Sequence, residues 1–197
     1  MKKVCLFVDG SNLYGGQYEL FGPKNYLSFK KLIVQIEKSL EIKFSKIFFY
    51  ASFSPASSKL NKKNQEYIKN ESFFYKNVKE IKNLNFFKGY RSKTSGKEKE
   101  VDVKLAVDIV NFAHLDKYDE LYLFSGDADF MHALEVAKSR GKKINILALE
   151  NRIPNRFAYF YKTFVFNFGK TSKNYKSDKQ KIKEFFLNKN RVIESVK

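Results

Sequence analysis

The apolar run VCLFV at residues 4–8, followed at once by Asp9 and Gly10, decides the fold. It shows no polar alternation, and it is bounded by Lys3 and by an aspartate. This pattern is typical of a strand that is buried on both faces of a parallel sheet. We therefore expect a central strand here. Three further runs have the same character and a fourth is weaker; they lie at residues 47–51, 121–124 and 144–149, and at 84–89.

Segments with helical spacing separate these runs. Ser28 is placed to cap a helix whose apolar residues are Leu32, Ile33, Ile36 and Leu40. Residues 101–112 are apolar almost all round, which predicts a fully buried helix. Two further helices are expected over 57–82, where apolar residues recur at multiples of seven (Leu60, Tyr67, Phe74 and Ile81), and over 130–139, before Gly141.

The alternation of strands and helices over the first 150 residues predicts a three-layer α/β fold with a mostly parallel central sheet. In such folds ligands bind at the carboxyl ends of the strands, where the strand order reverses. A short aromatic helix at 154–161 and a last edge strand at 164–168 complete the expected domain, residues 1–168.

Residues 169–197 form a tail of different composition. From residue 170 onward it contains nine basic and three acidic residues. Ile182, Phe185 and Phe186 could line one face of a short helix. The tail is therefore either a helix docked on the domain or a free basic arm.

The composition indicates a folded protein with a polyanionic partner. Of the 197 residues, 43% are hydrophobic, which excludes a disordered chain. The formal net charge of +17 favours nucleic acid, although a genome rich in lysine codons is an alternative source of that charge. The lone cysteine, Cys5, excludes an intramolecular disulfide and is expected in the core. No apolar stretch is long enough for a signal peptide or a membrane span, so we expect a cytoplasmic protein that does not bind membranes.

Four aspartates are the candidate metal ligands. Asp9 follows the first strand, Asp102 opens the apolar helix, and Asp127 and Asp129 follow the run at 121–124. In a parallel sheet these positions meet at one edge, where bare carboxylates would repel one another. Mg²⁺ or Mn²⁺ would relieve that repulsion, since hard cations prefer oxygen ligands. Such ions can promote phosphodiester hydrolysis.

The polar neighbours of these acids allow two interpretations. Ser11 and Asn12 could orient a carboxylate or a water, or could cap a local turn. Asp127 could likewise cap a helix, with Asp129 interacting favourably with the helix dipole.

Three motifs in order resemble one family. FVDGSNLY, KEVDVKLAVDI and LYLFSGDADF are similar to the NYN domain, and more narrowly to its LabA-like branch, which is related to PIN-domain nucleases. The resemblance covers about residues 3–150. It implies a PIN-like fold and a metal-dependent ribonuclease centre.

Carried over by position, the resemblance puts the acidic metal site on Asp9, Asp102, Asp127 and Asp129, with Asn12 as its polar partner. Ser125 is expected to support these acids. Asp108 matches another acidic position of the family, but on an ideal helix it points about 120° away from Asp102. We therefore expect Asp108 to support the site or the fold rather than to bind metal.

Basic residues beside the acids are candidate phosphate contacts, namely Arg91, Lys93, Lys99 and Lys104. Ser11 is a further candidate substrate contact. The loop 91–99 is either a lip that grips the substrate or a solvated connection. His114 and His132 lack metal-ligand spacing, and we expect neither to be catalytic.

Together these observations favour a Mg²⁺- or Mn²⁺-dependent endoribonuclease acting on RNA that is at least partly single-stranded. The alternative is a non-catalytic RNA-binding or regulatory module that keeps the acidic pocket. A DNA-directed nuclease of the related flap type fits less well, because the chain is short and lacks recognisable duplex-binding motifs.

Overall fold

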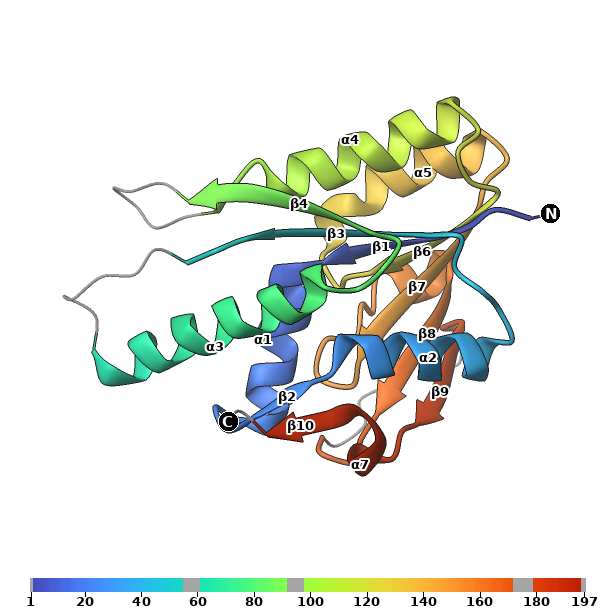
Figure 1. Cartoon of the computed structure of the whole chain (residues 1–197). Coiled ribbons are helices and arrows are strands. Elements are labelled where there is room, and N and C mark those ends of the chain that lie inside the picture. The colour runs from blue at the N-terminus through green and yellow to red at the C-terminus, as the bar shows by residue number, and fades with distance from the viewer. Residues whose placement is uncertain (1, 55–60, 92–97, 172–178, 196–197) are drawn as a thin grey trace.

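A long sheet crosses the molecule with the strand order β5-β4-β3-β1-β6-β7-β8-β9 (Figure 1). The computed structural model describes residues 2–54, 61–91, 98–171 and 179–195. Neighbouring strands pair in parallel, except β5, which is antiparallel to β4. The strands are β1 (Val4–Asp9), β3 (Lys46–Ser52), β4 (Leu84–Arg91), β5 (Glu98–Lys99), β6 (Glu120–Phe124), β7 (Lys143–Leu149), β8 (Lys162–Asn167) and β9 (Ile182–Phe186).

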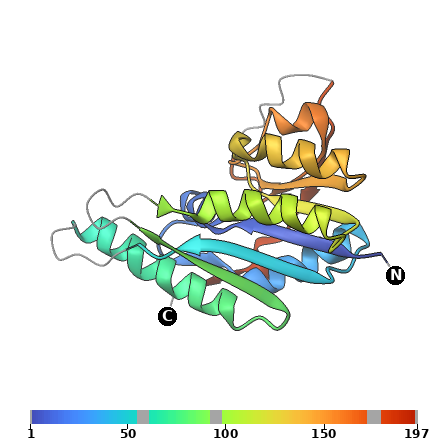
Figure 2. The same cartoon turned by 90° about the horizontal axis from the view of Figure 1, so that it is seen from above.

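Helices cover both faces of this sheet. Val4, Leu6 and Val8 of β1 pack against one helical layer, while Cys5 and Phe7 pack against the other, as the two-residue period of a strand requires. The first layer contains α1 (Gly10–Phe21), α2 (Phe29–Leu40) and α3 (Lys62–Lys79); the second contains α4 (Val101–His114), α5 (Met131–Ser139) and α6 (Phe157–Phe160). Figure 1 shows the two layers below and above the sheet, and Figure 2 shows α4 lying along it. The predicted three-layer α/β fold is confirmed.

Most of the predicted strands are confirmed, and β1 is central as expected, between β3 and β6. Cys5 is buried in the core. The helix expected over 57–82 is shorter, because Asn61 caps it by accepting a hydrogen bond from the Asn64 amide; Leu60 lies outside the described residues. Ser28 occupies the N-cap position of α2, but its side chain makes no capping hydrogen bond there.

The prediction of a helix buried on all sides at 101–112 is wrong. Val101, Leu105 and Ile109 of α4 face the sheet and are buried, but Val103 and Val107 on the outer side are 67% and 53% exposed. The helix lies in an outer layer, so only one stripe of it can contact the core.

The predictions of a last edge strand at 164–168 and of a helix in the tail are also wrong. β8 is not an edge strand, because residues 182–186 form β9 beside it. Phe185 packs on Phe164 and Phe166, with ring centroids 5.9 Å from each. The spacing of Ile182, Phe185 and Phe186 spans five residues, which is too short to separate a helix from a strand, and the open backbone edge of β8 favours the strand.

The end of the tail is also docked. α7 (Lys189–Val192) buries Val192 completely, and β10 (Ile193–Ser195) pairs with β2 (Asn25–Leu27) in a small antiparallel sheet. Figure 1 shows this C-terminal segment beside β2 and α2. In the described part of the chain, no helix is both long and apolar enough to cross a membrane.

Candidate functional site

The candidate site lies where β1 and β6 end. The chain turns from β1 to β3 on one side of the sheet and reaches β6 on the other, so the crevice between β1 and β6 is the point where the strand order reverses. Asp9 ends β1, and the segment Ser125-Gly126-Asp127 follows β6. The two segments therefore meet at the carboxyl edge of neighbouring strands.

Asp9 begins α1 and is held by three hydrogen bonds. Its Oδ1 accepts from the Asn12 amide at 3.0 Å and from the Ser11 hydroxyl at 2.9 Å. Its Oδ2 accepts from the Ser125 hydroxyl at 2.9 Å. Asp9 is thus the N-cap of α1 as well as a candidate site residue.

The environment of Asp9 works against its ionisation. Burial raises the pKa of Asp9 above its usual range, and the nearby negative charge of Asp127 raises it further. The hydrogen bonds from Asn12, Ser125 and Ser11 stabilise the carboxylate and lower the pKa in part. A positive ligand at this point would stabilise both carboxylates.

Close backbone packing holds the two segments together. Gly10 lies so near β3 that a Cβ on it would come within 2.8 Å of the Tyr50 carbonyl oxygen. A Cβ on Gly126 would lie 2.7 Å from the Arg152 carbonyl oxygen. The Gly126 amide donates to Oδ1 of Asn12 at 3.3 Å, which connects the loop after β6 to α1. Glycine is required at both positions because real Cβ atoms do not approach so closely.

Ser125 connects the two acids. Its hydroxyl donates to Asp9 and accepts a hydrogen bond from the Asp127 amide at 3.1 Å. Asp127 in turn caps the short helix η1 (Ala128–Phe130), since its Oδ1 accepts from the Asp129 amide at 2.9 Å. The capping alternative is therefore observed for Asp127, but it uses only Oδ1, and Oδ2 has no hydrogen-bond partner among the described residues.

The other two candidate acids do not complete a metal cluster with this pair among the described residues. Asp129 lines a hollow between α4 and α5, and Asp102 is exposed in the first turn of α4. Among the described residues, no three His, Cys, Asp or Glu side chains lie close enough to hold a metal ion. The structure brings Asp9 and Asp127 together, but it does not assemble the four-aspartate cluster.

Asp108 lies inside the fold, where it accepts two hydrogen bonds. Tyr50 donates its hydroxyl to Oδ2 at 2.8 Å, and Lys104, one helical turn earlier, pairs with Oδ1. Tyr50 is the residue of β3 that lies opposite Asp9 in the sheet. Burial, together with Asp108, raises the pKa of Tyr50 well above its usual range, so its hydroxyl stays protonated and keeps donating.

The basic candidates are partly engaged within the protein. Lys104 pairs with Asp108, and Arg91 lies 3.5 Å from a carboxylate oxygen of Glu71. Lys93 lies outside the described residues. The backbone of Lys99 pairs with Tyr90 in the β4–β5 ladder. A phosphate contact by any of these four remains a prediction.

Glu71 is a buried carboxylate that the motifs do not reveal. It accepts a hydrogen bond from the Ser54 amide at 2.7 Å, just beyond β3, and it pairs with Arg91 at the end of β4. Burial raises the pKa of Glu71. It therefore ties the ends of β3 and β4 to α3 at the same sheet edge as Asp9. The signal was its place on the buried face of α3, four residues after Tyr67 and three before Phe74.

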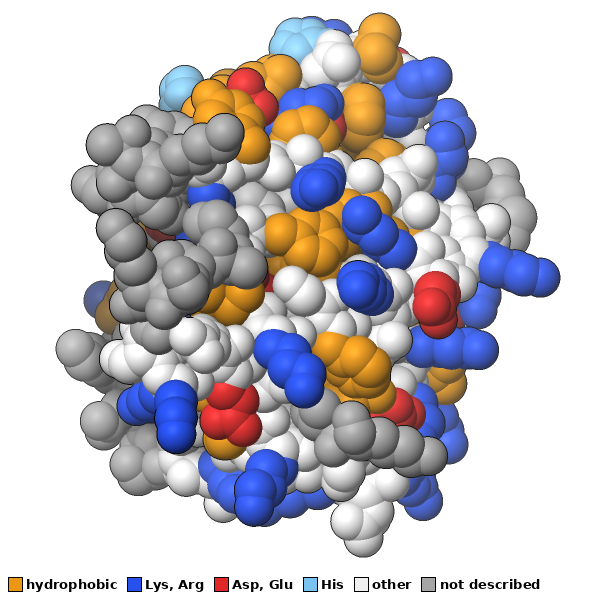
Figure 3. Space-filling view, turned by 60° about the vertical axis from the view of Figure 1, so that its left-hand side comes forward, with side chains coloured by type: hydrophobic (Ala, Val, Ile, Leu, Met, Phe, Trp, Pro, Cys, Tyr) orange, Lys and Arg blue, Asp and Glu red, His pale blue; other side chains and the backbone are white. Residues whose placement is uncertain are grey.

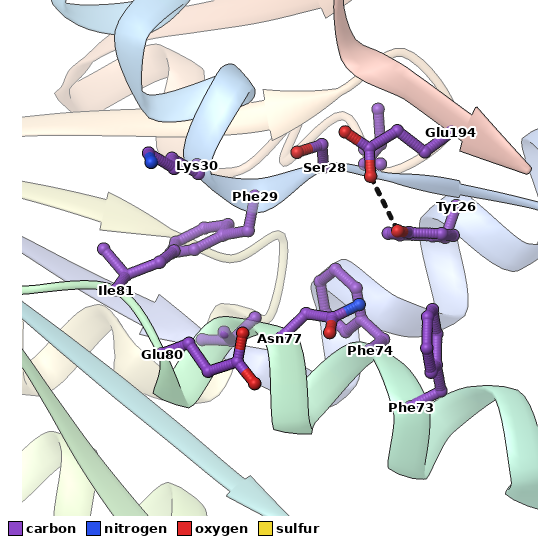
Figure 4. Close-up of a pocket in the computed structure, with 12 residues that line it drawn as sticks. Tyr26, Ser28, Phe29, Lys30, Phe73, Phe74, Asn77, Glu80, Ile81 and Glu194 are labelled. Carbon is purple, nitrogen blue, oxygen red and sulfur yellow. Dashed lines mark hydrogen bonds between the residues drawn. The ribbon is translucent and has the colours of Figure 1, made fainter. Parts of the chain in front are cut away.

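A separate cavity of about 360 Å³ lies between α2 and α3 (Figure 4). Phe29, Phe73 and Phe74 are among its lining residues. The Tyr26 hydroxyl donates to Glu194 at 2.6 Å across one end of it. Asp9 and Asp127 are not among the residues that line this cavity, so it is distinct from the candidate site.

The chain was compared with protein families, with known proteins and with solved structures. The model of the NYN domain matches residues 3–167. The protein called "Low amplitude and bright protein LabA", from Synechococcus elongatus, is 21% identical over 154 residues, which cover 77% of this chain and 76% of that protein. A crystal structure of a protein of unknown function from Vibrio parahaemolyticus has a TM-score of 0.60 and 19% identity, covering 91% of this chain and 95% of the other. That structural likeness supports the fold.

Proposed function

The chain belongs to the NYN domain family, and from this premise we propose that it is a divalent-metal-dependent endoribonuclease. The family relationship itself suggests a nuclease or an RNA-related function, since PIN-like proteins are generally nucleases. The observation that supports catalysis is that Asp9 and Asp127 lie together at the switch point of the sheet, where the Ser125 hydroxyl donates to the Asp9 carboxylate and accepts from the Asp127 backbone amide.

The donor set fits a small hard cation. Mg²⁺ is usually bound by one or two protein carboxylates, with water and substrate phosphate completing its coordination. Asp9 and Asp127 supply two carboxylates, and the charge of Asp127 raises the cost of ionising Asp9. We propose that these two hold Mg²⁺ or Mn²⁺, with Asp102 and Asp129 as further ligands when RNA is bound. A metal at this point supplies Lewis-acid stabilisation of the phosphoryl oxygens.

The other residues of the site hold the carboxylates in place. Ser11 and Ser125 hydroxyls orient the two oxygens of Asp9, and Asn12 fixes the loop after β6 through the Gly126 amide. Asp108 and Tyr50 support β3 directly beside Asp9. These contacts keep the acids in one geometry, which is what catalysis by positioned charge requires.

The substrate class follows from charge and from the family. The net charge of +17 attracts a polyanion, and Lys and Arg side chains spread over the face that Figure 3 shows. We propose RNA that is at least partly single-stranded, with Arg91, Lys93, Lys99, Lys104 and Ser11 as contacts to its backbone. Contacts by Arg91 and Lys104 would compete with their pairs to Glu71 and Asp108.

The test is cleavage of single-stranded RNA, duplex RNA and single-stranded DNA, each with Mn²⁺ and with EDTA. We expect cleavage of single-stranded RNA in Mn²⁺, its loss in EDTA, and its loss in Asp127→Asn. Asp116→Asn is the matched control, because Asp116 is an exposed aspartate whose ion pair with Lys142 lies in another part of the surface. A wild type that cleaves nothing with any divalent ion, or cleavage that survives Asp127→Asn, would refute the proposal.

The second candidate is a non-catalytic RNA-binding or regulatory protein. The capping roles of Asp9 and Asp127 favour this candidate, since each acid stabilises the start of a helix without a metal. Filter binding of the same RNAs separates the two candidates: tight binding without metal-dependent cleavage supports the second. A rise in the melting temperature of the wild type with millimolar Mn²⁺, absent from Asp127→Asn, would support the metal site independently of activity.

A further inference from the structure

An apolar hollow lies between α4 and the start of α5. It measures about 530 Å³ and is lined by Ala106, Val107, Val110, Asn111, His114, Asp129, His132 and Ala133. Along its margin, Val103 and Val107 are 67% and 53% exposed, and Leu115 just beyond α4 is 56% exposed. Figure 3 shows hydrophobic and histidine side chains gathered along the upper margin of the molecule, over α4 and α5. We call this the α4–α5 face.

The exposed valines are not scattered. Val103 and Val107 lie one helical turn apart on the side of α4 away from the sheet, and the partly buried Val110 follows them at the edge of the core, so together they extend an apolar stripe from the core onto the surface. A surface helix normally carries polar residues there. A helix that is apolar all round is normally buried, which was the expectation from its sequence. The single chain leaves Val103 and Val107 uncovered.

We propose that a second copy of this chain covers the α4–α5 face, forming a symmetric dimer. The first argument is charge. Each copy carries +17, so charge repulsion opposes association and is weakest where the facing surfaces have few basic side chains. Among the described residues that line the hollow there is neither lysine nor arginine, although these make up 38 of the 197 residues.

The second argument is complementarity along α4. Its first turn carries Asp102, and its last turn carries His114, followed by the exposed Lys117 and by Asp116, whose charge is paired with Lys142. A two-fold axis near the middle of the helix runs two α4 helices antiparallel, so that each acidic start lies beside the basic end of the other. The helix dipoles are then also opposed favourably. The same axis sets Val107 of one copy against Val110 of the other. A parallel arrangement would place like charges together at both ends.

This inference does not depend on nuclease activity, because Asp9 and Asp127 do not line the hollow, although Asp129, one of the further ligands proposed above, does. It also makes a distinctive prediction about salt. Salt screens the repulsion between two basic molecules and leaves apolar burial intact, so self-association should strengthen as salt is raised. Association through bridging RNA would weaken instead.

Sedimentation velocity tests the proposal on the full chain, freed of nucleic acid, from low to high micromolar concentration. We expect a concentration-dependent dimer that Val107→Glu weakens by roughly tenfold or more, since symmetry buries the added carboxylate twice. Val34→Glu is a matched control, because Val34 on α2 is also 53% exposed. We expect this variant to dimerise as tightly as the wild type. Val103→Glu provides a second variant, and circular dichroism checks that each variant is folded.

Three outcomes would overturn the proposal. They are a wild type that stays monomeric over the whole concentration range, a dimer that folded Val107→Glu and Val103→Glu leave intact, and equal weakening by Val34→Glu. Association that disappears at high salt would point to a bridging polyanion and would overturn it as well. None of these outcomes bears on metal-dependent cleavage, which is measured separately.

Discussion

Glu120 at the start of β6 is expected to stabilise the strand that carries Ser125 and Asp127 at its other end. The residue is 3% exposed, and its carboxylate contacts Lys143 at 2.8 Å and Lys2 at 2.6 Å and accepts a hydrogen bond from the Asn145 side-chain amide at 2.7 Å. Burial alone would raise its pKa, but these partners prevail and lower the pKa of Glu120 from 4.5 to about 2. At about 1.4 kcal/mol per pKa unit, this corresponds to about 3 kcal/mol. Solvent around the two lysines, each more than half exposed, reduces it to about 2 kcal/mol.

The direction of the pH dependence follows from the coupling between proton binding and folding. A carboxyl whose pKa is lowered by folding contributes stability above its unfolded pKa, and this contribution is lost as the pH falls from 4.5 toward about 2. Glu120→Gln should therefore lower the free energy of unfolding by about 2 kcal/mol at neutral pH, with the difference from wild type vanishing by about pH 2. Urea unfolding across this range measures it. Glu66→Gln, on the exposed side of α3, is the control and should match wild type. A Glu120→Gln deficit that is the same at neutral and acid pH would refute the electrostatic explanation.

Three further predictions concern the site and the tail. Gly10→Ala should lower the free energy of unfolding by about 1–3 kcal/mol through overpacking against β3, whereas Gly15→Ala, whose Cβ would meet its nearest neighbour at 3.7 Å, should be neutral or stabilising in urea melts. Deletion of residues 182–197 should lower the urea midpoint sharply, because it removes β9 and the fully buried Val192; an unchanged midpoint would mean that the tail is only an RNA-binding arm. Asp108→Asn should cost about 1–2 kcal/mol of stability by breaking its pair with Lys104, and in single-turnover cleavage it should keep far more activity than Asp102→Asn; equal and complete loss would put Asp108 in the metal site.

Local patterns were enough to predict the centre of the fold. Each continuous apolar run corresponds to a strand, because a strand buried on both faces needs apolar residues at every position, and few other structures do. The position of Asp9 followed from the same rule. By contrast, α1 was not predicted as a helix, since Gly10, Gly15 and Gly16 are poor helix formers. Tertiary packing explains them: a Cβ on Gly16 would lie 3.2 Å from Leu149, so glycine lets α1 lie close to the sheet.

The failures share a physical cause, which is that contacts distant in sequence decided the outcome. β9 forms because β8 offers an open edge, and nothing within residues 182–186 encodes that edge. Glu71 is a site residue only because β3 and β4 end beside it, through Ser54 and Arg91. In the site itself, sequence order could bring Asp9 and Asp127 to one edge, but it could not determine that the described residues form no cluster of three acids there.

A capping role explains why each of Asp9 and Asp127 is an acid. It does not explain why the two acids lie close together. An N-cap carboxylate stabilises a helix by about 1 kcal/mol, and Asp9 and Asp127 each cap one. Capping does not require a second carboxylate nearby, and asparagine or serine would cap as well without the charge. Here Asp127 makes ionisation of the buried Asp9 more difficult, which destabilises the charged site. A buried Asp9 carboxylate beside the charge of Asp127, at the crevice where ligands bind in such sheets, is what the proposed cation and substrate would require and what two helix caps alone would not.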